Sequence, residues 1–220
     1  MRIHRVIVLL ALVACGSAAL AAEDVKYHFG LGASLPQGNA GEFLDDGWTM
    51  SGGATWFRPN SNLGFRVDFG VDWWDVKNEV LKQFDTTPET PSIDPPDDGD
   101  ARTWRLGLGL TWEPTHGKDG VGFYATGGLD LHYASYDIGE NVAVYGWYCD
   151  WWWGYCYPGY GTGEAIVSSD SSWEWGAYAG VGLVIPVGSG LQELYVEALY
   201  RWMDTKNAAE FVPITVGFRW

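Results

Sequence analysis

Two cysteines and a dense group of aromatic residues form the most unusual chemical feature of the chain. Cys149 and Cys156 lie within the stretch VYGWYCDWWWGYCYPGYG. Two cysteines this close in an exported protein predict a disulfide that fixes the shape of the segment. Tryptophan and tyrosine offer large, rigid contact areas and dominate binding surfaces. The candidate surface-binding residues are Trp147, Tyr148, Trp151, Trp152, Trp153, Tyr155 and Tyr157.

A second chemical feature is a set of acidic and basic residues at alternate positions within otherwise apolar segments. Such charges, if buried, are tolerated only when they are paired. From their expected heights along the strands, Asp72 should pair with Arg105, and Glu174 with Arg201. The predicted charge network comprises Arg66, Asp68, Asp72, Arg105, Asp130, Glu174, Glu197 and Arg201.

Hydrolytic chemistry would need a histidine beside a serine, and the sequence offers no good pair. His132 and Ser135 are three residues apart, so on one strand they face opposite sides. The acidic residues between Asp94 and Asp100 could attract calcium, but their spacing fits no calcium-loop pattern. We therefore expect no enzyme activity, no metal and no cofactor, with a lipid-modifying enzyme as the weaker alternative.

The first residues resemble an export signal. Basic residues precede an apolar stretch from Val6 to Val13, and Ala19-Leu20-Ala21 forms an A-x-A cleavage site. This predicts a signal peptide over 1–21 and one domain over 22–220. The alternative is a lipobox ending at Cys15, which would make that cysteine a lipidated N-terminus.

The charge of the chain limits which macromolecules it can bind. The formal net charge is −15, with 28 acidic and 13 basic residues. Nucleic acid, whose binding requires basic surfaces, is therefore excluded as a partner.

We expect β-strands to position the charged and aromatic residues named above. Apolar and polar residues alternate with a period of two throughout the chain after the predicted signal peptide, which is typical of strands. One face of these segments carries no charged residue, whereas the other carries the charges and most glycines. The predicted strands are 25–35, 48–57, 63–75, 103–113, 121–137, 173–187, 194–203 and 212–220.

Three features favour a membrane barrel over a soluble sandwich. Glycines on the polar face suit a crowded lumen. Aromatic residues end the apolar faces, as in Trp48 to Trp56 and Trp104 to Trp112, which is typical of aromatic girdles. Short connections alternate with mostly longer ones, the longest being 138–172. We predict an all-β fold: an eight-stranded antiparallel up-and-down transmembrane β-barrel.

The C-terminus carries a resemblance to a known family. Val212-Pro-Ile-Thr-Val-Gly-Phe-Arg-Trp220 alternates apolar residues and ends on an aromatic, and so resembles the terminal strand signal of outer-membrane proteins. Phe218 and Trp220 match its aromatic positions, with Trp in place of the usual Phe. The mature chain resembles the small OmpA/OmpX-like barrels. The resemblance implies integration in the bacterial outer membrane, loops at the cell surface, and recognition by the barrel-assembly machinery.

The expected function follows from this architecture. A monomeric barrel with a closed, salt-bridged lumen, set in outer-membrane lipid and lipopolysaccharide, would display loops for envelope integrity, adhesion or recognition of a surface glycan or protein ligand. Two other interpretations of the aromatic segment stay open, namely packing over the barrel mouth or into the lipid headgroups, and gating of a pore. The rival function is a small-solute channel or porin-like transporter, because the lumen glycines reduce side-chain volume.

Overall fold

A computed structural model describes residues 24–81, 98–115, 120–150, 155–188, 192–205 and 208–220, with Asp98 and the segments 139–150 and 155–168 described through their backbone alone. The predicted signal peptide and its cleavage site lie outside these residues. No helix within the described part is long and apolar enough to cross a membrane.

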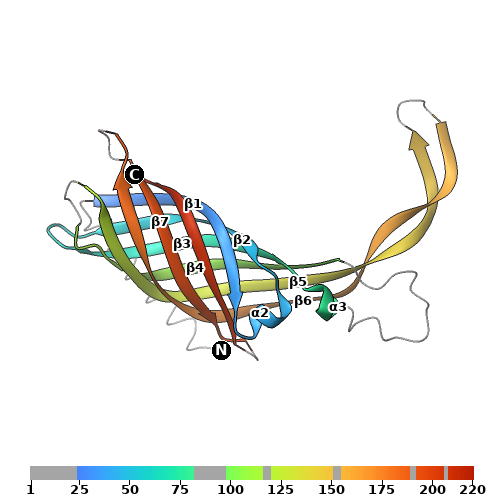
Figure 1. Ribbon diagram of the computed structural model, residues 1–220, viewed down its shortest axis with the longest axis horizontal. Coiled ribbons are helices and arrows are strands. Elements are labelled where there is room, and N and C mark those ends of the chain that lie inside the picture. Colours follow the sequence, from blue (N-terminus) through green and yellow to red (C-terminus); the bar gives the residue numbers. More distant parts are fainter. Residues whose placement is uncertain (1–23, 82–97, 116–119, 151–154, 189–191, 206–207) are drawn as a thin grey trace, which may run out of the picture.

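Eight antiparallel strands, each bonded to its neighbours in chain order, close into a barrel (Figure 1). The strands are β1 (Asp24–Gln37), β2 (Gly47–Phe57), β3 (Leu63–Asp75), β4 (Asp98–Trp112), β5 (Gly122–Asp150), β6 (Tyr155–Pro186), β7 (Glu193–Met203) and β8 (Ala209–Arg219). Two single-turn helices, α2 (Ala40–Phe43) and α3 (Asn78–Leu81), lie in the connections after β1 and β3. The predicted fold class is confirmed.

Closure of the barrel depends on the two ends of the folded chain. β1 pairs with β8 from His28 opposite Arg219 to Gln37 opposite Glu210. Beyond this ladder, Tyr27 N–H donates to the Trp220 carbonyl at 2.8 Å, and Trp220 N–H donates back to the Tyr27 carbonyl at 2.9 Å. The last residue of the chain therefore takes part in closing the sheet.

The barrel reverses the burial order of a soluble protein. Asp72, Arg105 and His132 are buried inside, whereas Phe69 and Leu129 are exposed on the outside. An apolar outer surface with every strand paired is the arrangement that a lipid bilayer requires. The predicted separation into an uncharged outer face and a charged inner face is confirmed.

Aromatic rings gather at both ends of the outer surface. At one end, Trp48 stacks on Trp73 with ring centroids 3.7 Å apart, and Trp73 lies 6.4 Å from Trp104. At the other end, Trp112 lies 6.1 Å from Phe123, and Tyr27 lies 6.4 Å from Trp220. These are the two girdles expected where a membrane barrel meets the lipid headgroups.

The prediction that 138–172 is a loop was wrong. β5 and β6 continue past the barrel as a two-stranded ribbon, paired as far as Asp150 opposite Tyr155, with one irregularity at Ile138/Gly139. Figure 1 shows this ribbon projecting from the barrel end that also holds α2 and α3, opposite the end marked C. Its many β-branched and aromatic residues favour extended structure, and each strand satisfies the backbone of the other.

Two further strands begin three or more residues earlier than predicted. β4 begins at Asp98 instead of 103, and β8 begins at Ala209 instead of 212. In both cases a partner strand is available, since Asp98 pairs with Gly139 and Ala209 pairs with Met203. Pairing across the sheet, which local sequence patterns do not report, extends these strands.

Candidate functional site

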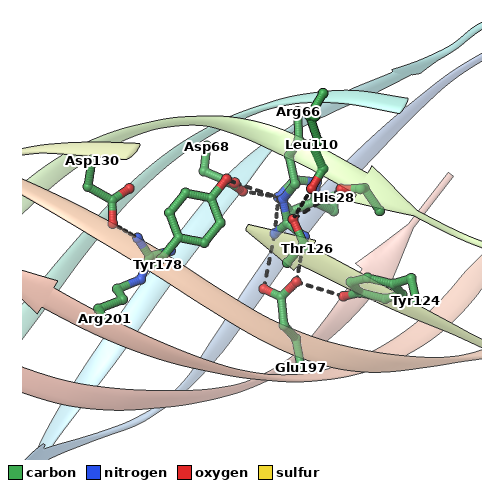
Figure 2. Close-up of polar contacts among 11 residues, drawn as sticks. His28, Arg66, Asp68, Leu110, Tyr124, Thr126, Asp130, Tyr178, Glu197 and Arg201 are labelled. Atoms are coloured by element: carbon green, nitrogen blue, oxygen red, sulfur yellow. Dashed lines mark hydrogen bonds and ion pairs between the residues drawn. The ribbon is translucent and has the colours of Figure 1, made fainter. Parts of the chain in front are cut away.

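The centre of the lumen is organised around Arg66 on β3. Its Nε donates to Asp68 Oδ2 at 2.7 Å, and its Nη1 and Nη2 donate to the two Glu197 carboxylate oxygens at 2.5 and 3.0 Å. His28 Nε2 lies 2.7 Å from the other Asp68 oxygen. Figure 2 shows this cluster, whose charged members are all buried. The close pairing satisfies charges that could not otherwise be kept away from water.

Tyr124 connects this central cluster with the barrel end opposite the ribbon. Its hydroxyl donates to Glu197 Oε2 at 2.8 Å, and the Arg66 and Arg219 guanidinium carbons lie 6.0 and 5.6 Å from its ring centroid. Arg219 donates to both Glu113 oxygens, at 2.7 and 2.9 Å. Ion pairs and ring contacts thus connect the central cluster with the barrel end opposite the ribbon.

The end of the lumen nearer the ribbon holds two further ion pairs. Arg105 Nη1 bonds to Asp72, which confirms one predicted pair, and Arg105 Nη2 donates to Thr49 Oγ1 at 3.1 Å. Arg201 Nη1 bonds to Asp130. Both pairs are buried, so this region is crossed by side chains from β3, β4, β5 and β7.

The predicted pairing of Glu174 with Arg201 was wrong. β7 ends its ladder with Met203 opposite Gly176, so Glu174 lies beyond the paired part of β7, where it faces His132 on β5. The stagger between barrel strands shifts residues that look level in the sequence. Asp130, which lies opposite Gly176, takes the place predicted for Glu174.

Glycines on the inner wall leave room for these large side chains. A methyl group on Gly30 would lie 2.3 Å from the Tyr195 hydroxyl, and one on Gly182 would lie 2.2 Å from Tyr124 Cζ. One on Gly70 would lie 2.5 Å from Arg105 Nη2. The space that these glycines provide is therefore occupied by tyrosine and arginine, not left as a path.

An apolar layer covers the charged lumen at the ribbon end. Trp74 packs edge-on to Phe211 with ring centroids 5.3 Å apart, and Trp74 Nε1 donates to the Ser34 carbonyl at 3.2 Å. Phe211 also lies edge-on to His132, at 5.9 Å. Trp74 and Phe211 are buried, so the wide rings separate the ion pairs from the outside of that end.

Sequence reasoning missed several lumen residues. Tyr124, Tyr178 and Glu193 belong to the network: Tyr178 lies under the Arg201 guanidinium at 4.7 Å, and Glu193 accepts bonds from Lys26 at 3.0 Å and Arg219 at 2.6 Å. The two tyrosines share the alternation phase of the inner-face residues on their strands, which was an available signal. Glu193 lies one residue before the predicted strand 194–203, whereas β7 begins at Glu193.

Those predicted surface-binding residues that the structure describes lie at the far end of the ribbon. Trp147 and Tyr148 are on β5, opposite Pro158 and Tyr157 of β6, and Tyr155 begins β6. Trp151, Trp152 and Trp153 lie outside the described residues. Cys149 stands directly opposite Cys156 in the backbone register, and the disulfide itself stays a prediction.

The two residues of the predicted assembly signal lie at the barrel end opposite the ribbon. Phe218 is on β8, and both Phe218 and Trp220 are exposed on the outer surface. This placement is compatible with the predicted assembly signal, whose recognition stays a prediction. Of the acidic segment considered for calcium, Asp94 and Asp97 lie outside the described residues.

A comparison with known protein families supports the same architecture. Residues 7–220 match the family described as outer membrane protein beta-barrel domain. No curated protein sequence matches the chain.

Several solved structures are similar at low identity. A major outer membrane protein from Thermus thermophilus has 13% identity and a TM-score of 0.49, covering 90% of this chain and 99% of that one. Ail, the attachment invasion locus protein of Yersinia pestis, in complex with a heparin analogue, has 11% identity and a TM-score of 0.44 with the same coverage. The N-terminal barrel domain of Pseudomonas aeruginosa OprF has 12% identity and a TM-score of 0.40, again with that coverage.

The family match spans nearly the whole chain and agrees with the closed eight-stranded barrel, its apolar outer surface and its aromatic girdles. The protein therefore belongs to the outer membrane protein beta-barrel domain family and is located in the bacterial outer membrane.

Proposed function

We propose that this protein is a closed barrel that holds a recognition element, the β5–β6 ribbon, at the cell surface, where it contributes to adhesion or to contacts that preserve the envelope. The observation that carries the proposal is the ribbon itself. Its ladder continues beyond the barrel to Cys149 opposite Cys156, and so brings the aromatic residues of the sequence to the part most distant from the membrane.

The register supports the predicted disulfide. Directly opposed residues in an antiparallel pair have Cα atoms about 4.5 to 5.5 Å apart, which is within the range that a disulfide spans. A covalent link at this position would hold Tyr148 and Tyr157, the adjacent opposed pair, in one arrangement. A rigid aromatic surface loses little conformational entropy on binding.

The interior supports a function outside the lumen. Ion pairs of Arg66, Arg105 and Arg201, together with Tyr124 and Tyr178, cross the barrel. An eight-stranded barrel has an interior that side chains just fill. The same observation disfavours the alternative, a small-solute channel, because Gly30, Gly70 and Gly182 are covered by large side chains.

The proposal includes the orientation of the barrel in the membrane and the partners of its surfaces. Outer-membrane barrels keep short turns on the periplasmic side and longer segments outside, which supports a position of the ribbon, α2 and α3 at the cell surface. The exposed aromatic girdles would contact lipid and lipopolysaccharide. The barrel-assembly machinery would recognise Phe218 and Trp220 while it inserts the protein into the membrane as a monomer.

A binding experiment on whole cells tests the proposal. Cells displaying the protein would be applied to an array of neutral and acidic oligosaccharides and to immobilised extracellular-matrix proteins. We expect the intact protein to confer binding, and replacement of Trp151, Trp152 and Trp153 by Ser to remove at least nine-tenths of it. A matched control replaces Val142, Val144 and Ile166 of the same ribbon by Ser and should retain binding.

Two results would contradict the proposal. One is binding that survives the triple Trp substitution at full strength. The other is equal loss in the control and the Trp variant, which would show that ribbon folding and not its aromatic surface is responsible.

A further inference from the structure

A polar pocket of about 450 Å³ lies at the base of the ribbon, next to the irregularity at Ile138/Gly139. All its lining residues are on β5 and β6 and carry side-chain oxygens, and the last four of them are exposed: Tyr133, Ser135, Asp137, Ser169, Asp170 and Ser171. This ribbon-base pocket is therefore open to solvent, and its size is within the range of small-molecule sites.

The strand register brings most of the lining to one surface. Tyr133, Ser135 and Asp137 alternate along β5 and so point to the same side of the sheet. Ser171 stands directly opposite Ser135, and Ser169 stands directly opposite Asp137. Directly opposed residues of two paired strands share a face. Five of the six lining side chains therefore belong to one face of the β5–β6 pair.

The sixth lining residue, Asp170, has the opposite alternation phase but is held beside the pocket. Its Oδ1 accepts a hydrogen bond from Ser171 N–H at 2.8 Å. Within the described part of the chain, no hydrogen bond occupies the side-chain oxygens of Asp137 or of the three lining serines. These oxygens are therefore available to a ligand.

An aromatic pair borders the pocket on its barrel side. Tyr133 stands opposite Trp173 on β6, with ring centroids 5.0 Å apart, and Trp173 is 66% exposed. Trp104 of the girdle stands opposite Tyr133 on β4, so the pair continues the girdle around this end of the barrel. Girdle rings lie at the level of the lipid headgroups. The ribbon-base pocket, one step further along the strands, lies just outside that level.

The lining groups indicate the kind of ligand. A carboxylate only accepts hydrogen bonds, whereas a serine hydroxyl both donates and accepts them. A ligand that satisfies these groups must therefore supply several hydrogen-bond donors. The exposed face of Trp173, in contrast, favours an apolar partner. A sugar ring meets both requirements, because it carries hydroxyl groups around its edge and C–H groups on its face.

The charge of the pocket favours a neutral sugar. Two of the six lining residues are carboxylates, and none is basic. Arg102, which stands opposite Ser135 on β4, has its guanidinium carbon 5.9 Å from the centre of the Trp73 ring and is thus directed toward β3. The carboxylates repel phosphate, sulfate and uronate groups. Among the described residues, no three acidic, histidine or cysteine side chains gather to hold a metal ion.

From these observations we infer that the ribbon-base pocket binds a neutral sugar ring, whose C–H face packs on Tyr133 and Trp173 while its hydroxyls donate to Asp137 and Asp170. The inference goes beyond the proposed function, because this site lies at the base of the ribbon and not at its far end. Two sources offer such a ring, namely the lipopolysaccharide of the same membrane and a saccharide in solution.

Matched probes test the inference. The protein in phospholipid nanodiscs would be titrated with maltose, lactose and methyl mannoside by saturation-transfer NMR, with empty nanodiscs subtracted. Methyl glucuronide supplies a sugar ring with a negative charge, and mannitol supplies the hydroxyls without a ring. We expect saturable binding of at least one of the three neutral sugars, with a Kd at least tenfold below those of methyl glucuronide and mannitol.

Substitutions connect the binding with this pocket. Trp173→Ser should weaken binding of the neutral sugar at least tenfold, and so should Asp137→Ala combined with Asp170→Ala. Trp112→Ser in the girdle at the other end, and Asp46→Ala at an exposed position, are the matched controls and should leave it unchanged. Replacing the two pocket carboxylates by Asn should reduce the discrimination against methyl glucuronide severalfold.

A second set of nanodiscs identifies the source of the ring. One preparation would contain lipopolysaccharide with neutral core sugars, and the other would contain lipopolysaccharide that lacks them. Loss of soluble-sugar binding in the first preparation alone would assign the ring to the membrane. Unchanged binding in both would assign it to a saccharide in solution.

Three outcomes would overturn the inference. They are no saturable binding of any neutral sugar, binding of methyl glucuronide or mannitol as tight as that of the neutral sugar, and binding that both Trp173→Ser and the double Ala variant leave intact. Replacement of Trp151, Trp152 and Trp153 by Ser should not affect sugar binding here, so failure of the proposed recognition function and failure of this site are distinguishable.

Discussion

Arg66 and Glu197, which are 131 residues apart in the chain, form a two-bond ion pair in the centre of the barrel, at 2.5 and 3.0 Å. The pair joins β3 to β7 across the lumen, and Asp68, His28 and Tyr124 bond to its members or to one another. The stability of the barrel should therefore depend on keeping both charges together.

Glu197→Gln removes one charge from this pair. Because Arg66 would keep only Asp68 as an ionised partner, the free energy of unfolding should fall by about 3 kcal/mol, the lower end for breaking a buried pair. Urea titration of protein refolded in lipid vesicles, followed by heat-modifiable gel mobility, measures the change. Glu42→Gln, an exchange at an exposed position, is the control. A loss no larger than that of the control would contradict the network.

Asp72 and Arg105 allow a charge-reversal test. Each single reversal, Asp72→Arg or Arg105→Asp, places two like charges inside the barrel and should lower the folded yield severalfold. The double reversal restores opposite charges and should recover at least half of the lost yield, because both positions are buried between β3 and β4. The yield is read from the fraction with folded mobility. A double variant no better than the worse single variant would exclude the direct interaction.

Gly182 makes room for Tyr124, since an added methyl group would lie 2.2 Å from the tyrosine ring. Gly182→Ala should cost about 1 to 3 kcal/mol, which is typical of overpacking. In a Tyr124→Leu background the same exchange should cost much less, and a double-mutant cycle measures the difference. Gly52→Ala, whose nearest contact would be 3.3 Å away, serves as the outward-facing control. Equal costs in both backgrounds would show that the two residues do not compete for space.

The cost of placing a charge on the lipid-facing surface should depend on how deep in the bilayer the charge lies. Leu129 lies midway along the barrel part of β5, whereas Val121 precedes that strand, and the two are similarly exposed, at 63% and 68%. Leu129→Arg should cost about 2 to 4 kcal/mol and Val121→Arg at most about 1 kcal/mol, because a charge is most costly at the bilayer midplane. Unfolding from vesicles measures both. Similar costs for the two substitutions would mean that Leu129 does not lie deeper in the bilayer than Val121.

Much of this architecture is readable from the sequence. The alternation of residues such as Arg66, Asp68 and Asp72 with apolar neighbours predicts which face of each strand is inside, and this phase is local information. The pair of Asp72 and Arg105 was predictable because β3 and β4 are joined by direct neighbour pairing. The pair of Arg201 and Asp130 was not, because it depends on the stagger of β5, β6 and β7, which accumulates around the barrel.

Other features depend on contacts that no local pattern reports. The ribbon that extends β5 and β6 is stabilised by mutual pairing, so a segment with glycines and a proline still forms strand. An apolar cavity at the ribbon end of the barrel is lined by Leu44 and Val76 from two connections and by Ile138 of β5. These residues are unremarkable in sequence, and they come together only because the barrel brings the connections and the strand to one end.

The ion pairs and tyrosines that cross the lumen should leave no path for ions. Single-channel recording of the refolded protein in a planar bilayer tests whether the lumen is closed by its own side chains. We predict no conductance steps from protein shown to be folded by its gel mobility, whereas a Tyr124→Ala/Tyr178→Ala/Arg66→Ala variant, in which three lumen-filling groups are removed, should show them. Steady, reproducible steps from the unaltered protein would mean that the lumen is open and would favour a small-solute channel.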